Sequence, residues 1–257
     1  MRKKILAANW KMNFTHSEAE SYLKSFVSEI RDFNDDVDVV IIPPFTAIPA
    51  LVTASERVQT LRIGAQNMHW EKSGAFTGEI SASMLRALYV RYVILGHSER
   101  RTLFGETDEI VNRKVKAALD AGLRPIFCLG ESLYERDSNQ VEQVLERQIR
   151  KGLEGVSSHD LTEVVIAYEP CWAIGTGRTA SPVEAEDAHA FIRSVLGKVS
   201  DRTTADRIRI QYGGSVKPDN VEQLMRQKNI DGALIGGASL DPRSFAQIIR
   251  STEAAMA

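Results

Sequence analysis

Cysteine is scarce in this sequence. Cys128 and Cys171 are the only two among 257 residues, and they are not spaced as a CxxC pair. Two isolated thiols are typical of proteins in a reducing cytosol, so we expect a cytoplasmic protein. Histidine is also rare, and none of the five has metal-ligand spacing to another histidine or to a cysteine. A zinc site is therefore not indicated.

Long apolar runs and runs of charge of one sign are both missing. The apolar stretch after the basic start, Ile5 to Ala8, is far shorter than a signal-peptide core, and no run approaches a membrane span. The 32 basic and 34 acidic residues are interspersed and give a net charge of −2. We therefore expect no membrane and no nucleic-acid partner.

What the sequence does contain is a regular alternation of strand and helix patterns. Its length suits one α/β barrel, so residues 1–257 are expected to form a single domain. Several apolar runs are continuous instead of alternating, which is typical of parallel strands covered on both faces. The expected strands are residues 4–9, 37–42, 62–65, 92–95, 124–129, 164–168, 209–212 and 231–235.

The segments between these runs carry helix signals. Ser17-x-x-Glu20 and Ser181-Pro182-x-Glu184 both read as capping boxes, and Pro218 is expected to open a further helix. Repeated β-then-α units favour a parallel α/β fold. Periodicity alone does not distinguish a closed barrel from a doubly wound sheet. The count of eight strands favours a (β/α)8 barrel.

Three polar side chains follow predicted strands directly, where both folds place active sites. Lys11 can pair with a phosphate or a developing oxyanion, although an isolated lysine is more often a solvated surface group. His97 begins a helical segment, where the helix dipole disfavours imidazolium, so it is a candidate neutral electrophile; a lone histidine is more often structural. Glu169 lies beside apolar residues that would raise the pKa of its carboxyl, as a general base requires, and an ion-paired role is equally compatible.

Glycine-rich segments follow three of the strands. Gly175-x-Gly177-x-x-Ala180 matches a dinucleotide-binding pattern as text, but Glu169-Pro170-Cys171-Trp172 intervenes between the preceding strand and the glycines, and a mobile lid fits better. Gly213-Gly214-Ser215 and Gly236-Gly237 follow the seventh and eighth strands. The loops after these strands are the recurrent phosphate site of the barrel fold.

Taken together, these motifs resemble the triosephosphate isomerase family along essentially the whole chain. The matching segments occur in family order: Asn9-Trp10-Lys11-Met12-Asn13, Gly64-Ala65-Gln66-Asn67, Gly96-His97-Ser98-Glu99-Arg100-Arg101, the stretch from Glu169 to Ala180, Tyr212-Gly213-Gly214-Ser215-Val216 and Gly232-Ala233-Leu234-Ile235-Gly236-Gly237-Ala238. The resemblance implies a cofactor-independent isomerase of glycolysis and gluconeogenesis that interconverts dihydroxyacetone phosphate and glyceraldehyde 3-phosphate through an enediolate.

The resemblance also implies roles for individual residues. Lys11, His97 and Glu169 would be catalytic, with His97 as electrophile and Glu169 as base. The residues implied to bind the substrate are Asn9, Lys11, Gly175, Ser215, Gly236 and Gly237. The residues implied to surround the site or belong to the lid are Ser98, Glu99, Trp172, Ile174, Tyr212 and Leu234. Two departures, Cys171 where valine is common and Arg178 where lysine is usual, fall at the lid hinges and remove no catalytic group.

The family further implies a homodimer. A loop that begins at Gln66 and ends at Glu79 would reach the partner's active site with Thr77 at its tip, and Met68, Trp70 and Phe76 would otherwise be partly stranded in solvent. Two alternative functions remain open from the sequence. One is a Schiff-base aldolase on the same fold with Lys11 as nucleophile, and the other is a catalytically silent binder of phosphorylated ligands.

Overall fold

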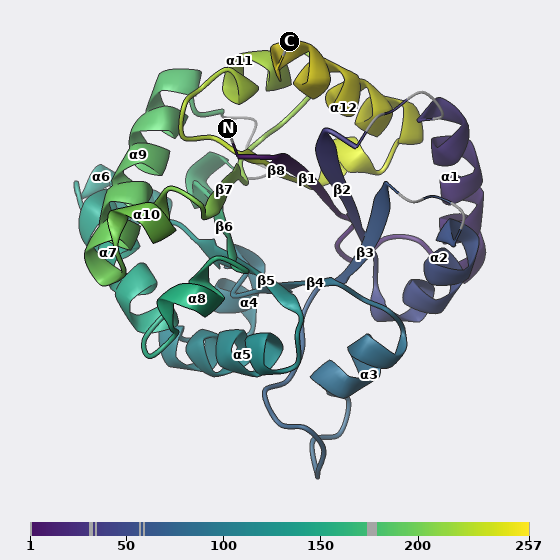
Figure 1. Ribbon diagram of the computed structural model, residues 1–257, viewed down its shortest axis with the longest axis horizontal. Helices are drawn as coiled ribbons and strands as arrows, with labels where there is room; N and C mark the ends of the chain where they lie inside the picture. The colour runs from purple at the N-terminus through teal and green to yellow at the C-terminus, as the bar shows by residue number, and fades with distance from the viewer. Residues whose placement is uncertain are drawn as a thin grey trace.

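A computed structural model describes residues 2–30, 33, 35–56, 58, 60–173 and 179–256. Eight parallel strands close into a barrel in chain order, from β1 to β8. Figure 1 looks down the barrel, with the helices forming an outer ring around the strands. The predicted (β/α)8 barrel is confirmed, and the doubly wound sheet is excluded because β1 pairs with both β2 and β8.

The eight strands fall where the apolar runs predict them. Five strands have the predicted bounds, and each of the other three differs by one residue at its start: Leu61 joins the third strand, while Val164 and Asp231 precede the sixth and eighth strands. The strands are β1 Lys4–Asn9, β2 Val37–Ile42, β3 Leu61–Ala65, β4 Tyr92–Leu95, β5 Arg124–Leu129, β6 Val165–Tyr168, β7 Arg209–Tyr212 and β8 Gly232–Ile235.

The continuous apolar runs are explained by two separate cores. Alternate strand residues point inward and fill the barrel, among them Ile5, Ala7, Val40 and Ile94. Their neighbours point outward and pack against the helices in a larger cluster. Burial on both faces favours apolar residues at consecutive positions of these strands, which removes the usual alternation.

The helices of the described residues cover the outside of the barrel, and their ends follow local capping chemistry. Ser181 caps a helix as predicted, with Glu184 completing the box. The box at Ser17 is wrong: Thr15 and Glu18 form it instead, and Ser17 lies inside the helix. Pro218 does not open its helix either, because that helix begins at Val221.

The helix bounds are α1 His16–Glu29, α2 Ile48–Ser55, α3 Ala82–Ala87, α4 Ser98–Leu103, α5 Asp108–Asp120, α6 Leu133–Asp137, α7 Val141–Gly152, α8 Ser158–Leu161, α9 Pro182–Val199, α10 Arg202–Ala205, α11 Val221–Met225 and α12 Pro242–Met256, with short 3-10 turns η1 Phe45–Ala47, η2 Cys171–Ala173 and η3 Gly237–Ser239. Among the described residues, none of these helices has the length and apolar character needed to span a bilayer.

Candidate active site

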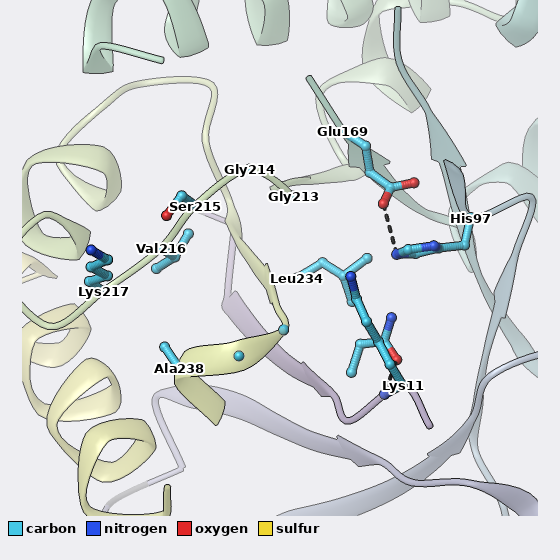
Figure 2. A pocket seen from close by; sticks show the side chains of 13 residues that line it. Lys11, His97, Glu169, Gly213, Gly214, Ser215, Val216, Lys217, Leu234 and Ala238 are labelled. Carbon is cyan, nitrogen blue, oxygen red and sulfur yellow. Dashed lines mark hydrogen bonds and ion pairs between the residues drawn. The ribbon is translucent and has the colours of Figure 1, made fainter. Parts of the chain in front are cut away.

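A cavity of about 290 Å³ opens at the carboxyl ends of the barrel strands. It brings together side chains from the first, fourth, sixth, seventh and eighth β–α connections, which are far apart in the sequence (Figure 2). The lining residues are Asn9, Lys11, His97, Glu169, Gly213, Gly214, Ser215, Val216, Lys217, Leu234, Gly236, Gly237 and Ala238. Lys11, His97 and Glu169 therefore converge on one cavity, as the strand-end argument requires.

Lys11 is held in an unusual backbone conformation just beyond β1. Its φ is 51°, in the left-handed region that residues with a side chain rarely occupy. The Lys11 N–H donates to Asn9 Oδ1 at 3.0 Å, and Gln66 Nε2 donates to the Lys11 carbonyl at 2.7 Å. Strain of this kind persists only where neighbours enforce it, and here it aims the ammonium into the cavity.

The Lys11 ammonium is paired before any ligand arrives. Its Nζ lies 2.6 Å from Glu99 Oε1. Glu99 is the second residue of α4, and its own backbone N–H donates to His97 Nδ1 at 3.3 Å. The implied position of Glu99 beside Lys11 agrees with this geometry, which links the lysine and the histidine through one residue.

His97 occupies the N-cap position of α4, as its predicted place at a helix start indicates. It is buried, and its Nε2 lies 2.9 Å from Glu169 Oε1. Because the Glu99 amide points at Nδ1, that nitrogen is the acceptor and Nε2 carries the proton. The ring thus presents an N–H to the cavity in its neutral form.

Glu169 is held away from the centre of the cavity by three donors. Besides His97, the Ser98 backbone N–H donates to Oε2 at 2.9 Å and Ser98 Oγ donates to Oε1 at 3.2 Å. The residue is fully buried. Its carboxylate is therefore in a resting position that a base must leave to reach a substrate carbon.

The expected rise in the pKa of Glu169 is wrong for this resting position, where the net effect is a lowered pKa. Burial is the largest effect and acts upward, but the charge and hydrogen bond of His97, with the Ser98 amide, outweigh it and lower the pKa. The same contact acts on His97: burial lowers the pKa of its imidazole, and the Glu169 carboxylate raises it by more. Each group therefore favours the charged form of the other while they touch.

Two glycines make room for this carboxylate. A Cβ on Gly213 would lie 2.9 Å from Glu169 Cγ, and a Cβ on Gly130 would lie 1.8 Å from the Glu169 carbonyl oxygen. Neither position can carry a side chain without displacing Glu169. The Gly-Gly after β7 therefore serves the base as well as any bound anion, a function that the sequence argument did not assign.

The opposite end of the cavity offers backbone donors. Ser215 follows β7, and Gly236 and Gly237 follow β8 and lead into η3. None of their backbone N–H groups donates to another described residue. Unpaired amides in a concave, glycine-lined segment are suited to bind a phosphate. Ser215 lies across the cavity from Glu169 (Figure 2).

Behind Glu169, the buried carboxylate of Glu131 collects three donors. Trp172 Nε1 donates to its Oε1 at 2.8 Å, Tyr168 OH at 3.1 Å and Arg136 Nη1 at 3.2 Å. Arg136 also stacks over the Trp172 ring at 4.2 Å. Glu131 thus fixes the position of Trp172, two residues before residue 174. No sequence motif indicated Glu131.

The remaining predicted site residues divide into two groups. Leu234 points from β8 into the cavity, and Tyr212 ends β7 beside it, with burial raising the pKa of its phenol to about 12. Ile174, Gly175 and the hinge residue Arg178 lie outside the described residues, so their predicted positions stay untested. Within the described chain, no cluster of three or more histidine, cysteine, aspartate or glutamate side chains could hold a metal ion.

Several residues of the site were not found from the sequence. Glu131 accepts hydrogen bonds from Trp172, Tyr168 and Arg136, which leave no periodic or motif signal. Gln66 belongs to a matching segment, but that segment does not indicate its hydrogen bond to the Lys11 carbonyl. Lys217 lines the cavity but follows a serine and a valine with no feature to distinguish it from a surface lysine. Only the closing of the barrel places these residues next to the strand ends.

Comparison with known proteins was made for the whole chain. The family model described as Triosephosphate isomerase matches residues 4–252. A protein named triosephosphate isomerase from Carboxydothermus hydrogenoformans is 50% identical over 254 residues, which cover 98% of this chain and 100% of the relative. The protein of that name from Herpetosiphon aurantiacus is 52% identical over 250 residues, covering 97% of this chain and 99% of the relative. One from Dictyoglomus thermophilum is 49% identical over 253 residues, covering 98% and 100%.

Proposed function

This chain belongs to the triosephosphate isomerase family and is an isomerase of dihydroxyacetone phosphate and glyceraldehyde 3-phosphate, and we propose that Glu169, His97 and Lys11 carry out its proton transfers. The observation that supports these roles is the convergence of the three side chains on one cavity. We take residues 1–257 to act as one domain. The roles follow from what each group can do there, as set out below.

The first step is the release of Glu169 from its resting contacts. A triose entering beside His97 displaces the carboxylate from Ser98 and from the imidazole. Without these contacts the burial effect on the Glu169 carboxyl is no longer opposed, and its pKa rises toward the range of an effective base. The same movement removes the charge that raises the pKa of His97, so the imidazole stays a neutral N–H donor.

Proton transfer then takes place between neighbouring carbons. Glu169 removes a proton from one carbon, the electrons move onto the adjacent carbonyl oxygen, and an enediolate forms. His97 Nε2–H and the Lys11 ammonium donate to the oxygens on which negative charge develops. Glu169 returns the proton to the other carbon, while the hydroxyl proton of the first carbon moves to the former carbonyl oxygen, so that ketose becomes aldose. No metal or organic cofactor takes part.

The phosphate group is the anchor. Backbone N–H groups of Ser215, Gly236 and Gly237 bind it, and Gly175 contributes a further N–H from the lid. Asn9 positions the substrate beside Lys11. Ile174 and Leu234 flank the base as an apolar clamp, and excluding water there strengthens every charge interaction in the site. Trp172, fixed by Glu131, supports the lid at its first hinge.

The aldolase alternative is disfavoured by the state of Lys11. A Schiff-base nucleophile must be free to attack a carbonyl carbon, whereas the Lys11 nitrogen is engaged by the Glu99 carboxylate at 2.6 Å. Borohydride reduction in the presence of dihydroxyacetone phosphate tests this point. Mass spectrometry should find Lys11 unmodified, and a reduced adduct on it would support the aldolase.

The role of Glu169 is tested by shortening it. Glu169→Asp moves the carboxylate by about an ångström and should lower kcat by roughly 100-fold, because a misplaced base misses its proton. KM should change little, since the phosphate contacts remain. Glu154→Asp, an exposed glutamate far from the cavity, is the matched control. A coupled assay on glyceraldehyde 3-phosphate measures both, and wild-type turnover in Glu169→Asp would reject the assignment.

We also propose a homodimer formed through residues 66–79. This loop projects beyond the barrel between β3 and α3 (Figure 1). Phe76 is 42% exposed on it, and Met84 of α3, Leu103 of α4 and the adjoining Phe104 are 53%, 74% and 66% exposed. Thr77 is exposed at its tip. Met68, expected to be stranded, is fully buried against the chain's own core, so the exposed surface is smaller than predicted.

The dimer is tested by placing a charge on this face. Leu103→Glu should shift the protein from dimer to monomer in analytical ultracentrifugation, since a buried unpaired charge is strongly unfavourable. Val183→Glu is the control, because Val183 is similarly exposed but lies at the start of α9, across the barrel from α3. A dimer that survives Leu103→Glu unchanged would contradict the interface. A cytoplasmic location is proposed with it, on the two unpaired thiols.

A further inference from the structure

Two lysines line the cavity within the described chain, and their charges are compensated differently. The Lys11 ammonium is paired with Glu99. The Lys217 ammonium makes no hydrogen bond or ion pair with any described residue, although its side chain lines the same cavity. In the described part of the cavity, Lys217 is thus the cation whose charge no contacting carboxylate offsets.

Lys217 stands at the phosphate end of the site. Figure 2 places it beyond Ser215 and Val216, across the cavity from His97 and Glu169. It is therefore distant from the carbons between which the proton moves, and it lies on the segment that leads directly to Ser215. A lysine in this position can act on the anionic end of the substrate and not on the reacting end.

The backbone that carries Lys217 is fixed by a neighbouring amide side chain. The Lys217 N–H donates to Asn220 Oδ1 at 2.8 Å, and Asn220 Nδ2 donates to the Ser215 carbonyl at 3.0 Å. Pro218 follows and restricts the chain further. The base of the side chain is thus held relative to Ser215, while the exposed ammonium keeps the reach of a lysine stem.

Acidic groups near Lys217 lie on its outer side. A second hollow of about 560 Å³ shares Lys217, Gly237 and Ala238 with the cavity, and Asp219 and Asp241 line it. Asp241 Oδ1 accepts the Ser244 N–H at 2.7 Å, at the start of α12. Neither carboxylate forms an ion pair with Lys217. The positive charge therefore remains effective toward the cavity mouth.

We propose that Lys217 attracts the phosphate dianion of the incoming triose phosphate and guides it to the Ser215, Gly236 and Gly237 amides, without entering the proton transfer. The inference rests on the proposed function, because it takes the anchored group to be a phosphate. Its physical basis is that a cation at a cavity mouth raises the local concentration of an anionic substrate and its rate of association. Lys217 then affects capture and leaves chemistry to Lys11, His97 and Glu169.

The test is the ionic-strength dependence of kcat/KM for Lys217→Gln and Lys217→Glu. With the ammonium about 8 Å from a dianion in water at about 0.01 M salt, the neutral variant should lose roughly fourfold in kcat/KM and the charge-reversed variant roughly 15-fold. At about 1 M salt the Debye length falls to about 3 Å, so the three proteins should converge. Turnover at saturation should stay within about twofold in all of them.

Two further variants make the result specific. Lys217→Arg keeps the charge and should keep the wild-type salt dependence. Lys24→Gln removes an equally exposed lysine from α1, outside the cavity, and should also follow the wild type. The proposal is overturned if Lys217→Gln and Lys24→Gln have the same salt dependence, or if Lys217→Gln lowers kcat with KM unchanged. A wild-type protein without isomerase activity would instead reject the function itself.

Discussion

The buried histidine of α9 should make this protein sensitive to acid well above the pH at which most carboxylates are protonated. His189 is fully buried, with Nδ1 3.3 Å from the Asn229 carbonyl oxygen, and its Nε2 has no partner among the described residues. Burial lowers the pKa of its imidazole from 6.5 to about 3. The folded protein therefore excludes a proton that the unfolded chain accepts.

The sign and size of the effect follow from this difference. Above about pH 7.5 His189 is almost unprotonated in both states and the full stability is present. As the pH falls toward 3, only the unfolded state gains a proton, so each pH unit lowers the free energy of unfolding by about 1.4 kcal/mol. Between about pH 7.5 and pH 5 the loss should reach about 2 kcal/mol.

The measurement compares the wild type with His189→Gln, which cannot titrate but can still donate to the Asn229 carbonyl. Urea unfolding at one protein concentration and several pH values gives the difference between the two proteins. Any fixed cost of the substitution cancels in the pH dependence, as do the carboxylates that both proteins share. The stability advantage of the wild type should shrink by about 2 kcal/mol on acidification over that range.

A second variant shows whether removing any histidine changes the pH dependence of stability. His159→Gln removes an exposed histidine on α8 and should keep the wild-type pH profile. Parallel profiles for the wild type and His189→Gln would refute the reasoning, since they would mean that the buried ring is protonated as easily in the folded protein as in the unfolded chain.

Three other perturbations have defined outcomes. Gly213→Ala places a Cβ 2.9 Å from Glu169 Cγ and should displace the carboxylate. In the coupled assay kcat should fall roughly 100-fold with little change in KM, and full turnover would show that the carboxylate does not need the space left by Gly213. Lys114→Met removes one of the two cations paired with the buried Glu106, so that only Arg100 remains, and it removes the donor to Asn67 Oδ1. The free energy of unfolding should fall by about 3 kcal/mol, and an unchanged urea midpoint would contradict this. Gln66→Leu removes the donor to the Lys11 carbonyl and should reduce kcat roughly tenfold while the melting temperature changes little; unaltered kcat would mean that Lys11 holds its own conformation.

The sequence predicts most of the fold because the determining signals are local. A doubly covered strand such as β2 needs only a run of apolar residues, and Ser181 with Pro182 and Glu184 contains a complete helix start within four positions. Where two such signals compete, local reasoning fails. Thr15-x-x-Glu18 and Ser17-x-x-Glu20 both fit a capping box, and only the packing of α1 onto the barrel decides that the helix starts after Thr15.

The three polar side chains at the strand ends were predictable, and the electrostatics of the candidate site was not. Lys11, His97 and Glu169 could be chosen because each follows a strand end. The lowered pKa of Glu169 could not be predicted. The donors that lower it, on His97 and Ser98, lie more than seventy residues away in the chain. Glu131 could not be predicted either, because its partner Trp172 lies 41 residues further along the chain, in another connection.

One hydrogen bond described above joins quaternary structure to turnover. Gln66 donates to the carbonyl of Lys11, and Gln66 is also the first residue of the loop proposed to grip the partner subunit. A separated subunit would lose the restraint on that loop and, with it, the restraint on a lysine whose φ of 51° is not self-sustaining. Specific activity should therefore decline on dilution over the same concentrations at which the dimer dissociates. The subunit would then acquire its catalytic activity when the dimer forms.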